Sequence, residues 1–524
     1  LSGTTAKGLP TGSQRLQFTR LPGWLPPREV SVTVLPAALH ALSGLGPELV
    51  LKLVYPALLA TFPCAVFLIA RRFLRTRTAF IVAVFVLAQD YFQQQLPAVA
   101  RQEIALVLFA SLVAVLTDRR LPVRQQRLLA AVLGVAIVLS HYTTAYLTIA
   151  LLVLALLAGL VARLLGRPLR EPRTILVALA ALGLAAAVWY GPVTHSASNA
   201  TSFAEDFRRD GLGLLPNADG SLITSYLRGN TSRSITPTEY AARAQETYAT
   251  ERPWIVPLPE ARDPAYRLAT AAPVAAPGGR VDDLVELARA VVLQSTNLLA
   301  VLGALALALG RRRTRAARTA GMLAIGSLGL LAAVRMSGTI ATAYNPERML
   351  VQAFALLAPG VGLVLEAIAR RRAGRVAAWG WAATILVVLV STSGLVAVVT
   401  GAGGTPNLHR GGESAERFQT SPAEVASARW LGQAAPPEAV IYADRYGQLR
   451  LLAHAGRGTS FNTAITPGTL DQHAWVYGSR ANMLEGRSRD ELQMRLATFR
   501  FPTRYLDDHW NRVYVNDESV VYAR

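Results

Sequence analysis

A polar stretch between two short apolar segments carries the first residues that could do chemistry. It reads Asp90-Tyr-Phe-Gln-Gln-Gln95, and Arg101-Gln-Glu103 follows it. Ionisable side chains at the ends of apolar segments are good pointers to a functional site. Arg101 could hold a phosphate through two parallel hydrogen bonds, and Asp90 and Glu103 are candidate general bases. The alternative is that Glu103 pairs with Arg101, or with an arginine elsewhere, and fixes the hairpin.

A second polar turn reads Ser140-His-Tyr-Thr-Thr-Ala-Tyr146. A histidine here could orient a hydroxyl or a phosphate group. His141 and Tyr142 are therefore candidate substrate-binding residues. The alternative is that His141 is a hydrogen-bonding cap of the turn.

The third candidate is Tyr344-Asn-Pro-Glu-Arg348, which enters another apolar segment. A phosphate at a helix N-terminus gains from free N–H groups as well as from an arginine. Arg348 is therefore a second candidate phosphate ligand, with Tyr344 and Asn345 as substrate contacts. The alternative is an arginine that extends to the membrane surface.

The fourth candidate is Asp444, which lies at the end of a predicted strand. An aspartate in this place is typical of a helix N-cap. We expect Asp444 to cap the next helix, and a substrate contact is the alternative.

The composition indicates how these residues are positioned. The chain has 524 residues, of which 52% are hydrophobic and 16% charged, with a mean hydropathy of +0.32. Soluble domains have about 25% charged residues, and apolar stretches of about 20 residues span a bilayer. The sequence therefore predicts a mainly α polytopic transmembrane bundle of about ten spans. The apolar segments lie at 48–70, 78–89, 101–117, 127–141, 144–162, 174–190, 286–309, 319–335, 347–369 and 376–400.

Arginine clusters orient the predicted spans. They follow the first, third, fifth, seventh and ninth apolar segments, and the connections between these are poor in arginine. Because cytoplasmic loops are enriched in Lys and Arg, this alternation predicts a plasma-membrane protein whose C-terminal region is extracytoplasmic. The clusters also account for the net charge of +20, so we expect no nucleic-acid partner. The single cysteine, Cys64, excludes a disulfide within the chain.

Five regions follow from this topology. We expect a partial first extracytoplasmic loop (1–47), transmembrane helices (48–190), an extracytoplasmic loop (191–285), further transmembrane helices (286–400) and an extracytoplasmic α/β domain (401–524). In the first region, the stretch from Val30 onward resembles a helix lying on the membrane surface; a plain lead-in to the first span is the alternative.

Local patterns predict the elements of the outer regions. Phe203–Arg209 and Pro237–Thr250 are helical candidates in the long loop, and prolines keep its later half irregular. In the tail, Ser421-Pro-Ala-Glu424 is a capping box that opens a helix to about Gln433. A buried strand at Ala439–Ala443, a helix at Tyr446–His454 and a hairpin around Asn516-Asp517 complete a small α/β domain.

Short motifs spread over most of the chain resemble a family of uncharacterised prokaryotic polytopic membrane proteins. That family in turn resembles the GT-C membrane glycosyltransferases. The motifs are Val30–Leu39, Leu51–Pro56, Ala100–Ala105, Ser140–Tyr146, and Tyr344–Arg348 followed by Ala358-Pro-Gly360.

The resemblance implies an enzyme that moves a sugar from a polyprenyl-phosphate donor to a cell-envelope glycan or protein on the outer face. Arg101 and Arg348 would then bind the lipid phosphate, and a carboxylate in the first outer loop would deprotonate the acceptor. No acidic residue occurs before Glu29. We therefore expect a catalytic carboxylate before Leu1. Because the predicted topology places Leu1 outside, we also expect an eleventh span before it. Glu29, Asp90 and Glu103 are weaker candidates.

Two other classes of function remain as alternatives. A transporter or flippase of lipid-linked glycans would favour an internal repeat, and none is visible. A non-catalytic scaffold of a cell-envelope complex would need no carboxylate in its first loop. No Walker, dinucleotide-binding, HExxH, CxxC or GxSxG motif occurs. The sequence predicts no metal site, and a divalent cation is the one cofactor left open.

Overall fold

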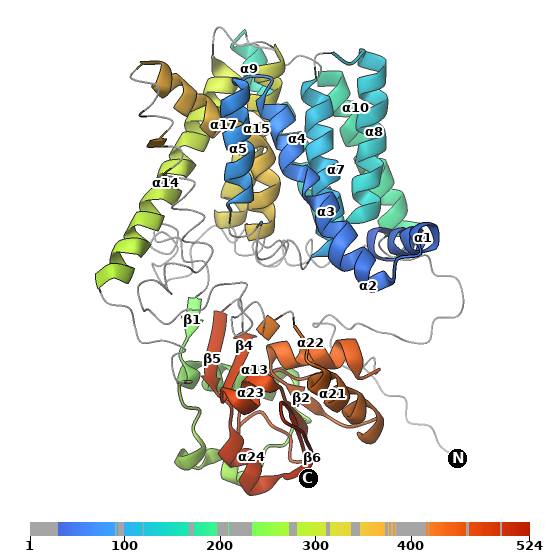
Figure 1. Cartoon of the computed structure of the whole chain (residues 1–524), viewed down its shortest axis with the longest axis vertical. Coiled ribbons are helices and arrows are strands. Elements are labelled where there is room, and N and C mark those ends of the chain that lie inside the picture. Colours follow the sequence, from blue (N-terminus) through green and yellow to red (C-terminus); the bar gives the residue numbers. More distant parts are fainter. Residues whose placement is uncertain are drawn as a thin grey trace. The chain divides into compact units, whose positions relative to one another are not determined.

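The computed structural model divides the chain into two compact units. It describes residues 30–89, 92, 99–118, 120–166, 172–195, 208, 233–271, 280–310, 315–336, 346–371, 376, 379–380, 383, 416–417, 419–456, 461–492 and 495–524. The helical unit comprises 25–229 and 278–407, and the α/β unit comprises 1–24, 230–277 and 408–524 (Figure 1).

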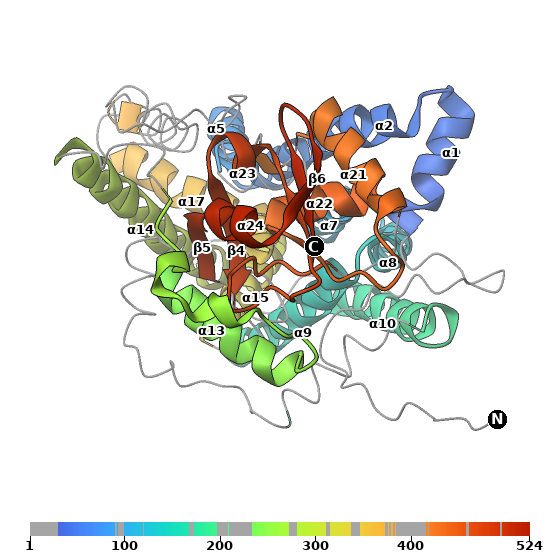
Figure 2. The same cartoon turned by 90° about the horizontal axis from the view of Figure 1, so that it is seen from below.

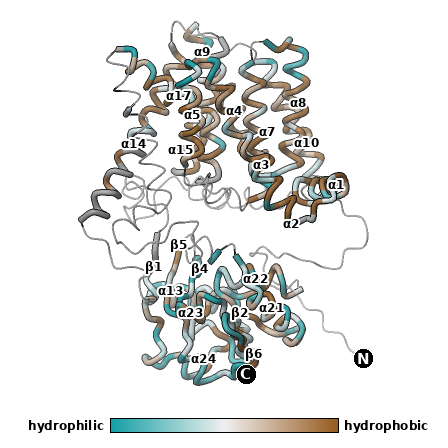
Figure 3. Tube along the Cα trace, viewed as in Figure 1, coloured by the Kyte–Doolittle hydropathy of each residue, from teal (hydrophilic) through white to brown (hydrophobic). Residues whose placement is uncertain are grey.

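The helical unit is built from long apolar helices, coloured as hydrophobic in Figure 3. A 3-10 turn (Val30–Val32) comes first, and a π-helical segment (Val50–Val54) leads into α3; a second (Trp189–Val193) follows α10. The helices are α1 (Val34–Ser43), α2 (Pro47–Leu49), α3 (Tyr55–Leu59), α4 (Thr61–Ala70), α5 (Thr76–Leu87), α7 (Ala100–Thr117), α8 (Val123–Ser140), α9 (Tyr142–Leu164), α10 (Pro172–Val188), α14 (Arg280–Leu309), α15 (Arg315–Met336) and α17 (Pro346–Arg371).

Seven segments of the described chain are long and apolar enough to cross a membrane. They are Val50–Ala70, Ala100–Thr117, Val123–Ser140, Tyr142–Leu164, Pro172–Val193, Ala317–Val334 and Met349–Arg370. Thr76–Leu87 and Gln294–Leu309 are shorter apolar helices where the sequence predicts two more spans. The predicted multi-pass helical bundle is thus confirmed, whereas most of the predicted span 376–400 lies outside the described residues.

Small residues set the closest helix contacts of this unit. A Cβ on Gly303 of α14 would meet the backbone of Gly360 in α17 at 2.2 Å. A Cβ on Gly321 of α15 would meet the backbone of Ala308 in α14 at 2.3 Å. Glycine at these contacts lets the backbones approach, as is common between membrane helices. The same helices bury the large apolar core that runs through the unit.

The helices α7, α9 and α17 all begin at one end of the unit (Figure 1). The ends of α7 and α17 meet the arginine-bearing connection between α4 and α5. There Arg72 forms an ion pair with Asp118 at 3.0 Å, and the Arg75 N–H donates to Glu366 at 3.1 Å. We call the end of the unit that holds these two contacts the Arg72 end. We call the other end, where α7, α9 and α17 begin, the His141 end.

The α/β unit contains two sheets. The four-stranded sheet has the order β2-β3-β7-β6, with β2 and β3 parallel and the other pairs antiparallel. The three-stranded sheet has the order β1-β5-β4, with β1 parallel to β5. The strands are β1 (Arg233–Ile235), β2 (Ile441–Ala443), β3 (Trp475–Gly478), β4 (Arg487–Leu492), β5 (Arg495–Arg500), β6 (Asn511–Val515) and β7 (Val520–Ala523).

Helices cover these sheets, and Figure 2 shows β4 and β5 side by side with α13 near them. The helices are α13 (Pro237–Glu251), α21 (Pro422–Ala434), α22 (Arg445–His454), α23 (Arg480–Leu484) and α24 (Thr503–His509), with 3-10 turns at Pro259–Arg262 and Pro264–Tyr266. The predicted capping box, buried strand, second helix and hairpin are all present. Residues 233–271 of the long loop also belong to this unit, because β1 adds to β5 and Tyr240 packs on Phe499.

Candidate functional site

Glu103 is a carboxylate buried in the helical bundle. It lies in the first turn of α7 with 0% of its surface exposed. Among the described residues, neither of its carboxylate oxygens has a hydrogen-bond partner. Burying an ionisable group away from donors is costly, and in a membrane bundle such a group is most often functional. Glu103 is therefore the strongest described candidate for chemistry.

Arg101 is the second residue of the same helix, and it is exposed. It lies two residues before Glu103, and side chains at that spacing on a helix point in different directions. Arg101 therefore faces outward at the helix N-terminus, where free N–H groups favour an anion, while Glu103 faces the bundle. The predicted cluster is split into an exposed cation and a buried acid.

His141 is buried and caps a helix. It is 1% exposed, and its Nδ1 accepts from the Thr144 backbone N–H at 3.4 Å and lies 2.9 Å from the Thr144 hydroxyl. This is the capping role expected as the alternative. The neighbouring Tyr142 is half-buried, with its ring 5.4 Å from that of His141.

Two residues that lie in the motifs Val30–Leu39 and Leu51–Pro56, but were not predicted as site residues, connect these places. The Tyr55 hydroxyl of α3 donates to the Ser31 carbonyl, and the Ser31 hydroxyl donates to the Ser140 carbonyl at 2.7 Å. Tyr55 also lies within electrostatic reach of Glu103. The 3-10 turn that holds Ser31 packs on both α7 and α8. The fold thus brings the segment after Glu29, the start of α7 and the end of α8 together at the His141 end.

A polar contact joins α9 to α17 deeper in the bundle. The Thr148 hydroxyl donates to the Thr144 carbonyl at 2.6 Å and accepts from Gln352 Nε2 at 2.9 Å. Because the hydroxyl hydrogen is already used, the Gln352 amide must turn its nitrogen to Thr148. Its Oε1 is then a buried acceptor with no partner among the described residues. Arg348 lies one turn before Gln352 on α17, and its side chain is outside the described part.

Several predicted site residues lie outside the described residues altogether. They are Glu29, Asp90, Tyr344 and Asn345. Of the described helical residues, Glu103, Arg101, His141 and Tyr142 are gathered at the His141 end. Tyr55 and Ser31 were missed because they carry no charge and lie in apolar stretches of the sequence.

In the α/β unit, Asp444 is a structural cap. It is fully buried, accepts from the Gly447 N–H at 2.8 Å, and accepts from Asn482 Nδ2 at 2.9 Å. Burial raises the pKa of this carboxyl, against the hydrogen bonds that favour its charged form. The predicted N-cap role is confirmed.

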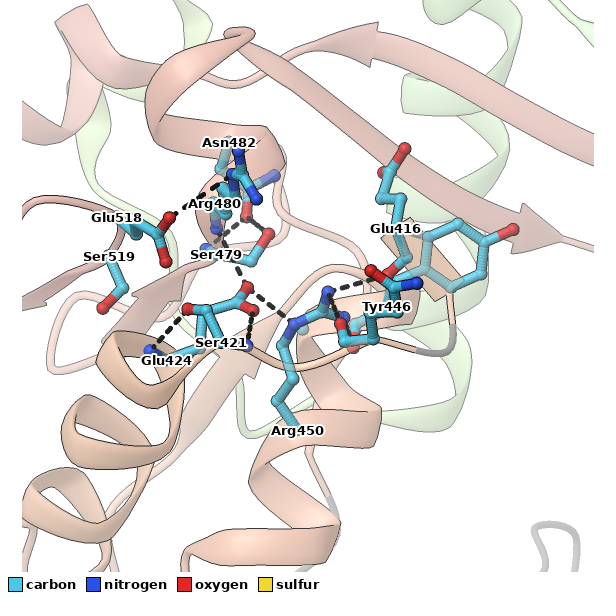
Figure 4. Close-up of polar contacts among 12 residues, drawn as sticks. Glu416, Ser421, Glu424, Tyr446, Arg450, Ser479, Arg480, Asn482, Glu518 and Ser519 are labelled. Carbon is cyan, nitrogen blue, oxygen red and sulfur yellow. Dashed lines mark hydrogen bonds and ion pairs between the residues drawn. The ribbon is translucent and has the colours of Figure 1, made fainter. Parts of the chain in front are cut away.

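A buried ion pair lies beside this cap (Figure 4). Arg450 Nε donates to Glu424 at 2.6 Å, with side-chain exposures of 5% and 2%. Glu424 also accepts from the backbone N–H groups of Ser421 and Arg480, each at 3.1 Å. Both charges are therefore surrounded by partners, as buried ion pairs require.

Another buried acid holds α13 to the C-terminal part of the unit. Asp490 of β4 accepts from the Tyr240 hydroxyl at 2.5 Å. Burial raises the pKa of Asp490 to about 6, although the Tyr240 hydrogen bond acts in the opposite direction. This contact joins two segments far apart in the sequence and explains why the loop folds with the tail.

No group of three or more His, Cys, Asp or Glu that could hold a metal occurs in the ranges that the structure describes.

No protein-family model matches the chain, and no curated protein matches its sequence. Two solved structures of ArnT from Cupriavidus metallidurans are similar to it. One, bound to undecaprenyl phosphate, has 15% identity and a TM-score of 0.43, covering 94% of this chain and 87% of ArnT. The other, in the apo state, has the same identity and TM-score and covers 95% and 87%.

Proposed function

We propose that this chain is an integral membrane glycosyltransferase that moves a sugar from a polyprenyl-phosphate donor to a cell-envelope acceptor. The observation that carries the proposal is Glu103, a buried carboxylate with no hydrogen-bond partner among the described residues. Beside it, Arg101 is exposed at the N-terminus of the same helix. A buried base and an exposed anion-binding position in the first turn of one helix suit a reaction that deprotonates an alcohol and releases a phosphate.

The proposed chemistry is a displacement at the anomeric carbon. Glu103 takes the proton of the acceptor hydroxyl, the acceptor oxygen bonds to the anomeric carbon, and the bond from that carbon to the phosphate oxygen breaks. The polyprenyl phosphate leaves with the electron pair. Arg101 and Arg348 neutralise its charge, aided by the helix N-termini on which they lie. The donor and acceptor come to this chain from the sequence resemblance.

The remaining predicted residues take supporting roles. Tyr142, Tyr344 and Asn345 are proposed to contact the sugar, and His141 to act by holding the start of α9. Glu29 and Asp90 remain alternative bases. The lipid tail of the donor is proposed to lie along the apolar helices, which expose large hydrophobic side chains.

The site is proposed to face the outside of the plasma membrane. Arg72 and Arg75 at the Arg72 end belong to the arginine-rich connections. The positive-inside rule assigns that end to the cytoplasm. The His141 end, and with it Glu103, then lies on the extracytoplasmic side, where the C-terminal domain is also proposed to be.

The test uses the full-length protein in detergent with radiolabelled polyprenyl-phosphate sugars. Glu103→Gln should lower turnover by about 10²–10⁴-fold and leave donor binding intact, whereas Arg101→Ala should weaken donor binding. Glu48→Gln and Arg124→Ala are matched controls, because both residues are exposed and lie outside the cluster. Wild-type turnover in Glu103→Gln, or a wild type that binds none of the donors, would refute the proposal.

A further inference from the structure

The 3-10 turn Val30–Val32 is held to the bundle by two hydrogen bonds of Ser31. Ser31 is 2% exposed: its carbonyl accepts from Tyr55 of α3, and its hydroxyl donates to the Ser140 carbonyl at 2.7 Å. Tyr55 is 0% exposed and Ser140 is 6% exposed. Two buried hydrogen bonds therefore fix a three-residue turn between helices that are far from it in the sequence.

The hydrogen bonds of Ser31 with Tyr55 and Ser140, which we call the Ser31 clamp, lie close to the candidate site. Ser140 directly precedes His141, and Tyr55 lies within electrostatic reach of Glu103. The turn also packs on α7, the helix that carries Glu103. A shift of the turn would therefore change the packing around the start of α7, where Glu103 lies.

Ser31 is the one fully buried residue of the turn Val30–Val32, and the two valines are half-buried. Burying polar groups of a short turn is favourable only when they are bonded. The two bonds satisfy the carbonyl and the hydroxyl of Ser31 within the apolar bundle and hold the turn against α3 and α8, so the arrangement suits positioning of the turn.

We propose that Ser31 is a positioning residue, held by Tyr55 and Ser140, that fixes the turn Val30–Val32 against α7, the helix that carries Glu103. Its action is indirect: it sets where the acceptor can approach the carboxylate, and it does not itself bind the donor phosphate. For its activity readout, this inference rests on the proposed glycosyltransferase function.

The experiment compares Ser31→Ala and Tyr55→Phe with wild type in the full-length protein. Because one positioning hydrogen bond is lost, we expect turnover to fall about 10–100-fold, which corresponds to about 1.4–2.7 kcal/mol, with donor binding unchanged. Ser31→Thr, which keeps the hydroxyl, should recover most of the activity. Hydrogen exchange of the amides of residues 30–34 should become at least about tenfold faster in Tyr55→Phe.

Two matched variants serve as controls. Tyr190→Phe removes another buried tyrosine hydroxyl that donates to a carbonyl, that of Val138, at 2.7 Å. Ser43→Ala removes a serine bond to the Leu39 carbonyl in the neighbouring helix α1. Both should retain wild-type turnover.

The outcomes separate this inference from the proposed function. Faster exchange at 30–34 with unchanged turnover would overturn the positioning role and leave the glycosyltransferase proposal standing. Unchanged exchange would show that the clamp does not hold the turn, and would also overturn it. If the wild type itself turns over no donor, the proposed function fails and the positioning role fails with it.

Discussion

The buried pair of Arg450 and Glu424 gives the sharpest quantitative prediction for the α/β unit. Arg450 donates to the Glu424 carboxylate and also to the backbone carbonyls of Tyr446, Glu416 and Gln419, at 2.6 to 3.0 Å. Glu424 has two further donors, the N–H groups of Ser421 and Arg480. The two partners therefore differ in what each leaves behind when it is removed.

Arg450→Met should be the more damaging change. It leaves the Glu424 charge buried with only two backbone donors and removes the arginine donor from three backbone carbonyls. Breaking a buried pair in this way costs about 3–5 kcal/mol. Glu424→Gln should cost about 1–3 kcal/mol, because Gln can still complete the capping box with Ser421 and Arg450 keeps its three carbonyls.

The double variant Arg450→Met/Glu424→Gln should cost less than the sum of the two. Once the arginine is gone, removing the charge of Glu424 relieves a buried, poorly compensated ion. We expect a coupling of about 1–3 kcal/mol, which is typical of groups in one network.

Hydrogen exchange of the amides in α21 and α22 is the appropriate assay, because it reports opening of this part of the chain without a global unfolding transition. A loss of 3 kcal/mol corresponds to an increase in exchange rate of about 10²-fold. Arg243→Met is the matched control: its pair with Glu239 is 2.8 Å long but about 40% exposed on both sides, so it should cost at most about 1 kcal/mol. Additive single effects, or equal effects in Arg450→Met and Arg243→Met, would refute the reasoning.

Three further predictions test topology, pH dependence and helix packing. In a Cys64→Ser background, a membrane-impermeant maleimide should label Ser43→Cys in intact cells and Arg124→Cys only after permeabilisation; the reverse pattern would invert the proposed orientation. Burial raises the pKa of Asp490 to about 6, above the value of about 3.9 in an unfolded chain. The contribution of Asp490 to the free energy of unfolding is therefore present below about pH 4 and is lost as the pH rises from about 4 to about 6. Asp490→Asn should therefore stabilise the unit by about 1–3 kcal/mol at pH 8 and by little at pH 4, measured as exchange of α13 amides, and equal effects at both pH values would contradict this. Gly321→Ala should lower the melting temperature in detergent, since its Cβ would lie 2.3 Å from the Ala308 backbone, whereas Gly183→Ala, with open space around it, should not.

The fold was largely predictable because its signals are local. The spacing of apolar segments predicted the bundle, and Ser421-Pro-Ala-Glu424 predicted the first helix of the tail with its capping box. The membership of 233–271 in the α/β unit was not predictable, because it depends on the pairing of β1 with β5 and on the Tyr240–Asp490 bond. Contacts at such sequence separation leave no pattern in a single sequence.

The candidate site was predictable in part for the same reason. Charge and position singled out Arg101, Glu103 and His141, since ionisable residues at span ends are conspicuous. That Arg101 is exposed and Glu103 buried follows from the helix phase relative to its neighbours, which the sequence did not reveal. Tyr55 and Ser31 could be found only once α3, α7 and α8 were placed together.

Glu103 differs from the buried carboxylates of Glu424, Asp444 and Glu366 in having no hydrogen-bond partner on either oxygen among the described residues, and this contrast supports assigning the chemistry to the helical unit. In the α/β unit, Glu424 and Asp444 each accept hydrogen bonds from several donors. In the helical unit, Glu366 at the Arg72 end is likewise paired with Arg370 at 2.5 Å. At the His141 end, Glu103 and the Oε1 of Gln352 are buried without a partner among the described residues. Unpartnered polar atoms are destabilising in a bundle, and such local costs persist most often where a ligand or a reaction uses the group. The same residue types are thus structural where they are satisfied and, on our proposal, functional where they are not.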